Sequence, residues 1–142
     1  MESTPVPPAP PAPEPIRLIV VDDDSGIRTL LEVSVSLDPR FELVGTAASA
    51  GEALRVLADL GDARVDLVLL DVTLPDRDGI EVLGDVRAAA HGARVALFTG
   101  WNDPETLERA TRAGADGIFP KDGSPRKLLD SLAAMCGAQP EP

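Results

Sequence analysis

The chain has 142 residues and a formal net charge of −11, with 44% apolar and 26% charged residues. This length and composition indicate one globular domain large enough to bury a core, and the negative charge disfavours nucleic acid and acidic membrane surfaces as partners. Because the sequence holds a single cysteine, Cys136, it forms no internal disulfide and fits a reducing cytosol.

The two ends of the chain are expected to lie outside the domain. Residues 1–15 (MESTPVPPAPPAPEP) hold half of the 14 prolines, a composition typical of an extended, disordered tail. A docking motif for a proline-recognising domain is the alternative reading of this segment. Residues 137–142 are predicted to form a second, short tail. No apolar run reaches the ~18 residues that span a bilayer, and the N-terminus does not resemble a signal peptide, so a cytoplasmic protein without a membrane partner is expected.

Five apolar segments between the tails are predicted to be strands. The first, third and fourth are nearly continuous apolar runs, which is the pattern of parallel strands that are buried on both faces. Pro120 would remove a hydrogen bond from a central strand, so the fifth segment is expected at an edge of the sheet. The segments are 17–22, 41–45, 65–71, 94–100 and 116–121.

Five helical segments separate or follow these strands. Apolar residues at helical spacing predict the inner face of each; in the first helix this face holds Ile27, Leu30, Leu31 and Val35. Cap residues mark three of the starts: the Ser49–Glu52 capping box, Asp103 before Pro104, and Ser124 before Pro125. Strand and helix alternating five times predict an α/β fold over residues 16–136, with a doubly wound parallel sheet flanked by five helices.

Polar residues gather at the predicted strand ends. Ligands of open α/β sheets bind beyond the carboxyl ends of the strands, so these residues are the candidates for chemistry. Like charges so close together repel, and therefore the aspartates either face water in an ordinary loop or surround a cation. The candidates are Asp22, Asp23 and Asp24 after the first strand, Asp71 at the end of the third, Thr99 at the end of the fourth and Lys121 at the end of the fifth.

This set of side chains suits phosphoryl transfer. Clustered carboxylates form a hard, oxygen-rich site for Mg²⁺, which often bridges a phosphate. A carboxylate that stays free acts as a nucleophile towards phosphorus, as in aspartyl-phosphate chemistry. A lysine and a hydroxyl bind phosphate oxygens and help to spread the charge of the transition state. The residues therefore predict a Mg²⁺-dependent phosphoryl site, with the cation explaining why three consecutive aspartates are tolerated.

Four motifs resemble the receiver domain of two-component response regulators. They are VVDDDSGIR, the acidic-pair segment; LLDVTLPDRDGIEVL, the phosphoacceptor segment; ALFTG, the threonine segment; and AGADGIFPKDGSPRKLL, the lysine segment. They occur in the order of that family and are distributed over nearly the whole of residues 16–136. The resemblance implies a flavodoxin-like sheet of order 2-1-3-4-5.

The resemblance also implies a role for each site residue. Asp71 is the expected phosphoacceptor, and Thr99 and Lys121 are expected to bind the phosphoryl group. The expected Mg²⁺ ligands are Asp22, Asp23, Asp71 and the backbone carbonyl of Thr73, with Asp23 more direct than Asp22. Asp24 is an additional carboxylate that is expected to face solvent.

The sequence departs from the family pattern in three places. The switch aromatic usually lies three residues before the lysine, where this chain has Ile118, and period-2 alternation directs the neighbouring Phe119 to the other face. Asp122 follows Lys121 where many members have proline, which resembles the branch that carries a helix-turn-helix output domain. No such domain follows in this sequence.

The sequence is accordingly interpreted as a stand-alone response regulator of bacterial type. A histidine kinase or phosphotransfer protein is the expected donor. A downstream protein is expected to bind the face formed by the fourth helix, the fifth strand and the fifth helix. The protein is not classed as an enzyme, because its catalysis is expected to be limited to its own phosphorylation and dephosphorylation. It is expected to be a monomer or a weak homodimer and to bind no nucleic acid.

Two alternatives from other classes remain open. One is a phosphohydrolase with an aspartate nucleophile, although such enzymes commonly have a second aspartate two residues on, where this chain has Thr73. The other is an interaction module whose phosphorylation is vestigial. A DNA-binding regulator is weaker, because of the charge and the missing output domain.

Several other residues have a functional and a plain structural reading. Trp101 is either a gate or output residue beside the site or a half-buried loop anchor. His91 is expected on the surface at a helix end, and Cys136 is expected to be partly packed. The cationic pairs Arg109–Arg112 and Arg126–Lys127 are read as solvated helix faces, with a docking surface for an acidic partner as the alternative.

Overall fold

The computed structural model describes residues 14–100 and 103–137. Within these ranges strands and helices alternate five times, as predicted. The elements in chain order are β1 (Ile16–Val21), α1 (Ser25–Ser36), β2 (Phe41–Ala47), α2 (Ala50–Leu60), β3 (Leu67–Asp71), α3 (Gly79–Ala89), β4 (Arg94–Thr99), α4 (Pro104–Arg112), β5 (Gly117–Pro120) and α5 (Pro125–Met135). No helix in the described ranges is both long enough and apolar enough to cross a lipid bilayer.

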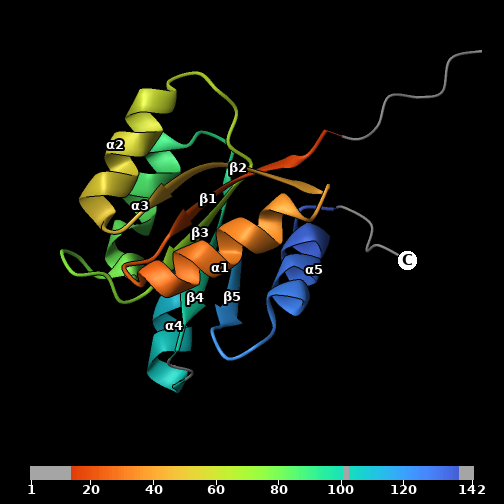
Figure 1. Ribbon diagram of the computed structural model, residues 1–142. Coiled ribbons are helices and arrows are strands. Elements are labelled where there is room, and N and C mark those ends of the chain that lie inside the picture. The colour runs from red at the N-terminus through yellow and green to blue at the C-terminus, as the bar shows by residue number, and fades with distance from the viewer. Residues whose placement is uncertain (1–13, 101–102, 138–142) are drawn as a thin grey trace, which may run out of the picture.

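The strands form one parallel sheet of order β2-β1-β3-β4-β5 (Figure 1). The predicted doubly wound topology is therefore confirmed, and its switch point lies between β1 and β3, where the chain order reverses. β5 is an edge strand that pairs with β4 alone, and Pro120 is its last residue. This position fits the missing N–H of proline.

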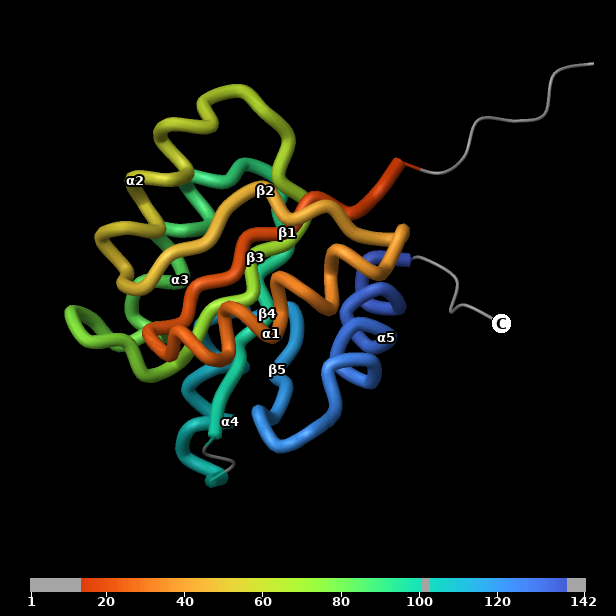
Figure 2. The backbone as a smooth tube through the Cα atoms, viewed as in Figure 1, coloured from red at the N-terminus to blue at the C-terminus, as the bar shows by residue number. Residues whose placement is uncertain are grey.

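Helices cover both faces of the sheet (Figure 2). One apolar core lies between the sheet and α1 and α5, and the other lies between the sheet and α2, α3 and α4. All five residues of β3 are buried, and alternate side chains contribute to the two cores. Leu67 and Leu69 join the first core, whereas Val68 and Leu70 join the second. The continuous apolar run of this segment thus results from burial on both faces.

Some sequence-based details differ from the structure: β3, for example, begins at Leu67, two residues after the predicted start. β2 continues two residues beyond the predicted end at Gly45, because Thr46 and Ala47 pair with the end of β1 after a register shift. The prediction that Leu30 lies on the inner face of α1 is wrong: Leu31 and Val35 are buried, but Leu30 is 51% exposed. A helix turns about 100° per residue, so neighbouring apolar residues cannot all face the core.

Side-chain caps begin all five described helices. The carboxylate of Asp24 accepts hydrogen bonds from the amides of Gly26 and Ile27, and Asp78 accepts one from Ile80. Ser49, Asp103 and Ser124 cap the other three helices, as predicted. Caps satisfy the free amides of a helix N-terminus. Asp24 and Asp78 consequently define the start of α1 and α3 directly beside the ends of β1 and β3.

Gly79, the first residue of α3, lies against the backbone of the Asp71 segment. Its amide donates a 2.7 Å hydrogen bond to the carbonyl of Val72. A Cβ at this position would overlap the carbonyl oxygen of Asp71 and lie 2.9 Å from the Cα of Val72. Because both obstructing groups are backbone, they cannot rotate away, and only glycine lets α3 start this close to the end of β3.

Replacing Gly79 should therefore destabilise the fold. We expect Gly79→Ala to lower the free energy of unfolding by at least about 2 kcal/mol, since the added methyl group displaces backbone. Urea unfolding followed by circular dichroism measures the change. Gly84→Ala is the matched control on the same helix, because nothing lies within 4 Å of the position that its methyl group would take. It should be neutral or stabilising by up to about 1 kcal/mol, and an equal loss in both variants would contradict the steric argument.

Candidate functional site

Four strand ends meet at the carboxyl edge of the sheet. Asp22 follows β1, Asp71 ends β3, Thr99 ends β4 and Lys121 follows β5. Asp22 is fully buried and Asp71 is 2% exposed; together with Thr99 they are the buried polar residues of the described chain. Asp23 is exposed at the mouth of the site. Parallel pairing thus brings together residues that are far apart in the sequence.

The ammonium group of Lys121 lies between two carboxylates. Its Nζ is 2.8 Å from Asp22 Oδ2 and 3.0 Å from Asp71 Oδ2. The geometry at Asp22 Oδ2 is that of an ion pair without a well-aligned hydrogen bond, so charge rather than directionality makes this contact. Nζ also lies 5.4 Å from the centroid of the Phe98 ring, which belongs to the core beneath α1 and α5.

Three carboxylates form a possible metal site. One oxygen from each of Asp22, Asp23 and Asp71 lies within 4.8 Å of the other two. Mg²⁺ binds oxygen ligands at about 2.1 Å in an octahedron, so a small inward movement would place all three on one ion. The Lys121 ammonium balances one of the three negative charges, and a divalent cation would balance the remaining two. The donor set and its charge therefore fit Mg²⁺.

Burial changes the protonation of the central carboxylate. Desolvation raises the pKa of Asp71 to about 6, and the nearby Asp22 charge adds to this, although the Thr73 amide and Lys121 oppose it. Burial lowers the pKa of Lys121, but its bonds to Asp22 and Asp71 outweigh this, so the pKa lies above its ordinary value. At neutral pH the site therefore holds a charged lysine and a largely ionised Asp71.

The backbone around Asp71 and Lys121 is tied into the sheet. The amide of Thr73 donates a 3.0 Å hydrogen bond to Asp71 Oδ1, which orients this carboxylate. The amide of Lys121 donates to the carbonyl of Thr99 at 3.0 Å, so the lysine and the threonine are held side by side. Thr73 itself is exposed at the start of the β3–α3 loop.

Two residues to which the sequence patterns assigned no role stabilise the acidic segment. Asp24 is exposed, as expected, but its carboxylate is the N-cap of α1 rather than a free charge. The guanidinium of Arg28 donates a 2.7 Å hydrogen bond to the carbonyl of Asp22. The preference of aspartate for helix N-caps is a signal that could have identified Asp24. Nothing in the sequence pattern reveals the Arg28 contact.

Asp76 is another residue to which the sequence patterns assigned no role, and it holds the β3–α3 loop against the start of α2. Its two carboxylate oxygens accept hydrogen bonds from the amides of Ala50 and Gly51, each at 2.9 Å. These bonds at the positive end of a helix lower the pKa of Asp76. Because the partners are 25 residues or more away along the chain, the interaction is invisible to local sequence patterns.

The residues of the expected switch lie on opposite faces of β5. Ile118 packs against the core beneath α2, α3 and α4, and Phe119 packs against the core beneath α1 and α5. The alternation predicted for this pair is therefore confirmed, and no aromatic side chain occupies position 118. Trp101 lies outside the residues that the structure describes.

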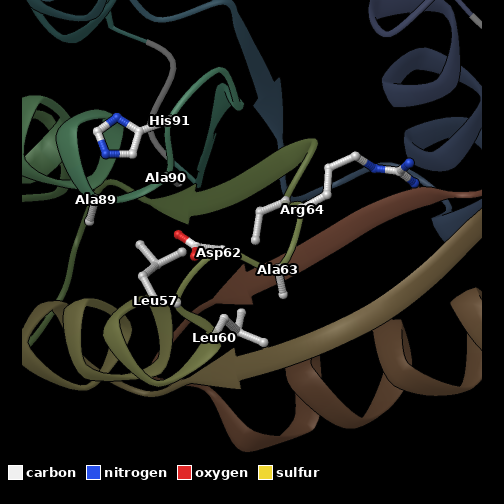
Figure 3. Close-up of a pocket in the computed structure, with 10 residues that line it drawn as sticks. Leu57, Leu60, Asp62, Ala63, Arg64, Ala89, Ala90 and His91 are labelled. Atoms are coloured by element: carbon white, nitrogen blue, oxygen red, sulfur yellow. The ribbon is translucent and has the colours of Figure 1, made fainter.

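A hollow at the opposite edge of the sheet does not have the features of a catalytic site. It has a volume of about 300 Å³ and lies between the ends of α2 and α3 and the loop before β3 (Figure 3). Asp62 and His91 line it, but their side chains come from different helix ends and do not meet. His91 is exposed at a helix end, as expected. Cys136 is half-buried against the α1–α5 core, and burial raises its pKa.

Because the pKa of Asp71 is raised in the folded protein, ionisation of this carboxylate lowers the free energy of unfolding. The native state binds the proton more tightly than the unfolded chain, so this cost is absent below about pH 4 and present above about pH 6. We expect Asp71→Asn to raise the free energy of unfolding by about 1–2 kcal/mol at pH 7.5 without Mg²⁺, the loss of the Lys121 contact offsetting part of the gain. At pH 5 the gain should be smaller.

Urea unfolding at the two pH values checks this expectation. The control is Asp59→Asn on the exposed face of α2, which should change stability by less than about 0.5 kcal/mol at either pH. A gain for Asp71→Asn that does not depend on pH would show that ionisation of Asp71 costs the fold nothing.

Comparison with known proteins agrees with this geometry. Residues 18–133 match the response regulator receiver domain family. The nitrate/nitrite response regulator NarL of Escherichia coli K12 is 31% identical over 84% of this chain, and the matched region is 54% of NarL. The chemotaxis protein CheY of Halobacterium salinarum is 29% identical over 86% of this chain and 98% of CheY. This chain thus spans about half the length of NarL but nearly all of CheY.

A solved structure shows the same arrangement of elements. The CheY-like receiver domain protein of Methanospirillum hungatei superposes with a TM-score of 0.73 at 28% identity, covering 87% of this chain and 94% of that one. The buried carboxylates, the lysine between them and the sheet order 2-1-3-4-5 accompany a family match over most of the chain. The chain belongs to the response regulator receiver domain family.

Proposed function

We propose that this protein accepts a phosphoryl group on Asp71 from a histidine kinase or phosphotransfer protein, with Mg²⁺ bound by Asp22, Asp23, Asp71 and the carbonyl of Thr73. The observation that carries the proposal is the buried Asp71 carboxylate, which shares the Lys121 ammonium with Asp22 beside a set of metal-binding oxygens. A carboxylate so placed is oriented and partly desolvated, which makes it a good nucleophile.

Different residues of this chain supply the nucleophile and the positive charge for the transfer. An Asp71 oxygen attacks phosphorus, and the bond from phosphorus to the donor histidine nitrogen breaks, so that nitrogen keeps the electron pair. Lys121 and the Thr99 hydroxyl bind phosphoryl oxygens and so offset charge in the transition state. The metal ion supplies further positive charge to these oxygens when it is bound. Asp71 must be ionised to attack, and a pKa of about 6 satisfies this at neutral pH.

The product is a switch rather than a turnover catalyst. The phosphoryl group adds about −1.5 to −2 charges at the carboxyl edge of the sheet. Thr99 and Lys121 move towards it and bias α4, β5 and α5 towards a second packing that a downstream protein recognises. We place this output on the face formed by α4, β5 and α5, in a cytoplasmic, monomeric or weakly dimeric bacterial protein whose catalysis is limited to its own phosphorylation and dephosphorylation.

Two competing functions receive less support. A phosphohydrolase commonly needs a second aspartate two residues after the nucleophile, and this chain has Thr73 there. A vestigial module is disfavoured because the acceptor, the acidic pair, the threonine and the lysine are all present at the same edge. In this proposal the protein acts as a stand-alone regulator and not as the receiver part of a NarL-like protein.

An exposed apolar stripe on α1 fits the docking of the donor. Leu30, Val33 and Leu37 are 51%, 54% and 80% exposed, and their spacing places them along one side of α1 and its C-cap. They are the large hydrophobic residues that stand exposed in the described ranges. Because α1 begins directly after the Asp22–Asp24 segment, a protein that packs on this stripe is close enough to deliver a phosphohistidine to Asp71.

Phosphorylation itself tests the acceptor. Incubation with acetyl phosphate and Mg²⁺ should add the mass of one phosphoryl group to the wild type and none to Asp71→Asn, as measured by intact-mass spectrometry. Asp24→Asn is the control, because this carboxylate caps α1 and asparagine keeps a cap acceptor. It should be phosphorylated like the wild type. No gain in the wild type despite Mg²⁺ binding would favour the vestigial module, and continuous phosphate release from many substrates would favour the phosphohydrolase.

The α1 stripe is tested by separating docking from chemistry. With any histidine kinase that phosphorylates the wild type, Val33→Ser combined with Leu37→Ser should lower kcat/KM for transfer about tenfold or more, because apolar contacts at the interface are lost. The rate with acetyl phosphate should not change, since this small donor needs no protein surface. Equal rates with the kinase would place the docking surface elsewhere.

A further inference from the structure

Helix α4 has few tertiary anchors. Ala110 is its one buried residue. The side chains of Thr106 and Arg112 bond within the helix or its cap, to Asp103 and Glu108 respectively. Among the hydrogen bonds and ion pairs of its described residues, only that of Arg109 reaches another element. The position of α4 on the sheet is therefore sensitive to this one side chain.

Arg109 was expected on a solvated helix face, but it reaches the loop that carries the phosphoacceptor. Its Nη2 lies 3.2 Å from Asp78 Oδ2, with the two side chains 41% and 32% exposed. The other oxygen of Asp78 caps α3 by accepting a 2.8 Å hydrogen bond from the amide of Ile80. Asp78 also pairs with Thr73 as an isolated β-bridge. The ion pair thus links α4 to the segment that holds Asp71 and Thr73.

The two partners of this ion pair belong to segments that are anchored differently. Asp78 is held by its cap to α3 and by its bridge to Thr73, so it stays with the loop. Arg109 belongs to a helix that begins at Pro104, close behind Thr99 in the chain. In the proposed switch Thr99 is drawn towards the phosphoryl group, and because α4 starts shortly after Thr99 in the chain, we expect this movement to shift α4 and to leave Asp78 in place. An interaction across two such elements favours one of the two packings.

We propose that Arg109 is a positioning residue that acts through Asp78: the ion pair forms in the unphosphorylated arrangement and lowers the affinity of the site for a phosphoryl group. This inference rests on the proposed function. It supplies a device for coupling the site to α4 in a chain that has Ile118, and no aromatic residue, three positions before Lys121. A half-exposed pair is weak, so it shifts the equilibrium by about two- to fivefold.

Beryllofluoride, a mimic of the phosphoryl group, measures this coupling. Its apparent affinity in saturating Mg²⁺ is determined by fluorescence or calorimetric titration for the wild type, Arg109→Gln, Asp78→Ser and the double variant. Serine keeps an N-cap acceptor for α3 while removing the charge. We expect each single variant to bind about two- to fivefold more tightly, and the double variant to bind no more tightly than either, because all three lose the same pair.

The signs of the two effects separate the proposal from simple electrostatics. Removing a cation weakens anion binding and removing an anion strengthens it, so charge alone predicts opposite changes in Arg109→Gln and Asp78→Ser. Arg112→Gln is the matched control, since Arg112 pairs with Glu108 on its own helix. It should bind beryllofluoride like the wild type, and Arg109→Lys should restore much of the wild-type affinity.

Hydrogen exchange gives a second readout that needs no ligand. Amides of Thr106–Arg112 should exchange faster in Arg109→Gln and Asp78→Ser than in the wild type or Arg112→Gln. Opposite changes in affinity, additive changes, or unchanged exchange in α4 would overturn the role of Arg109 while leaving the proposed function intact. Failure of the wild type to take up beryllofluoride or phosphate in Mg²⁺ would instead overturn the proposed function, and this inference with it.

Discussion

The site depends on a single cation held between two buried carboxylates. Asp22 and Asp71 lie at the ends of neighbouring strands with almost no exposure to solvent, and the Lys121 ammonium contacts both. Without it, two buried negative charges would face each other in a medium of low polarity, which proteins avoid by pairing or by protonation. The lysine leaves a residual negative charge, and a divalent cation is the natural complement to it.

The rest of the fold serves to hold these three groups. Right-handed crossovers place β1 and β3 side by side although a helix, a strand and a second helix separate them in the chain, and the pairing of β4 with β5 brings Lys121 alongside Thr99. Caps at Asp24 and Asp78 and the close approach of Gly79 start α1 and α3 immediately beyond the strand ends. Hydrogen bonds of Arg28 and Asp76 hold the loops between these elements, so the carboxylates stay in place. The packed core provides the stability that offsets the repulsion between them.

The β3–α3 loop after Asp71 connects the carboxyl edge of the sheet with helices α2 and α4. Asp76 joins it to the N-terminus of α2 and Asp78 joins it to Arg109 of α4. α4 buries a single alanine, whereas α3 on the same face of the sheet buries five residues. In the proposed switch we therefore expect a change of charge at Asp71 to affect α4 most, because this helix has few tertiary anchors.

Local sequence patterns were enough to predict the fold class, the edge position of the fifth strand, most helix caps and the residues at the strand ends. Period, capping and proline chemistry are local properties, and the rule that ligands bind at the carboxyl edge of such sheets converts them into a site. The folded chain was needed to show that Lys121 lies between Asp22 and Asp71, that Arg28 and Asp76 support their loops, that Leu30 faces outward, and that Arg109 reaches Asp78. These contacts depend on how elements pack in three dimensions, and packing angles and side-chain directions leave no trace in the spacing of residues along the chain.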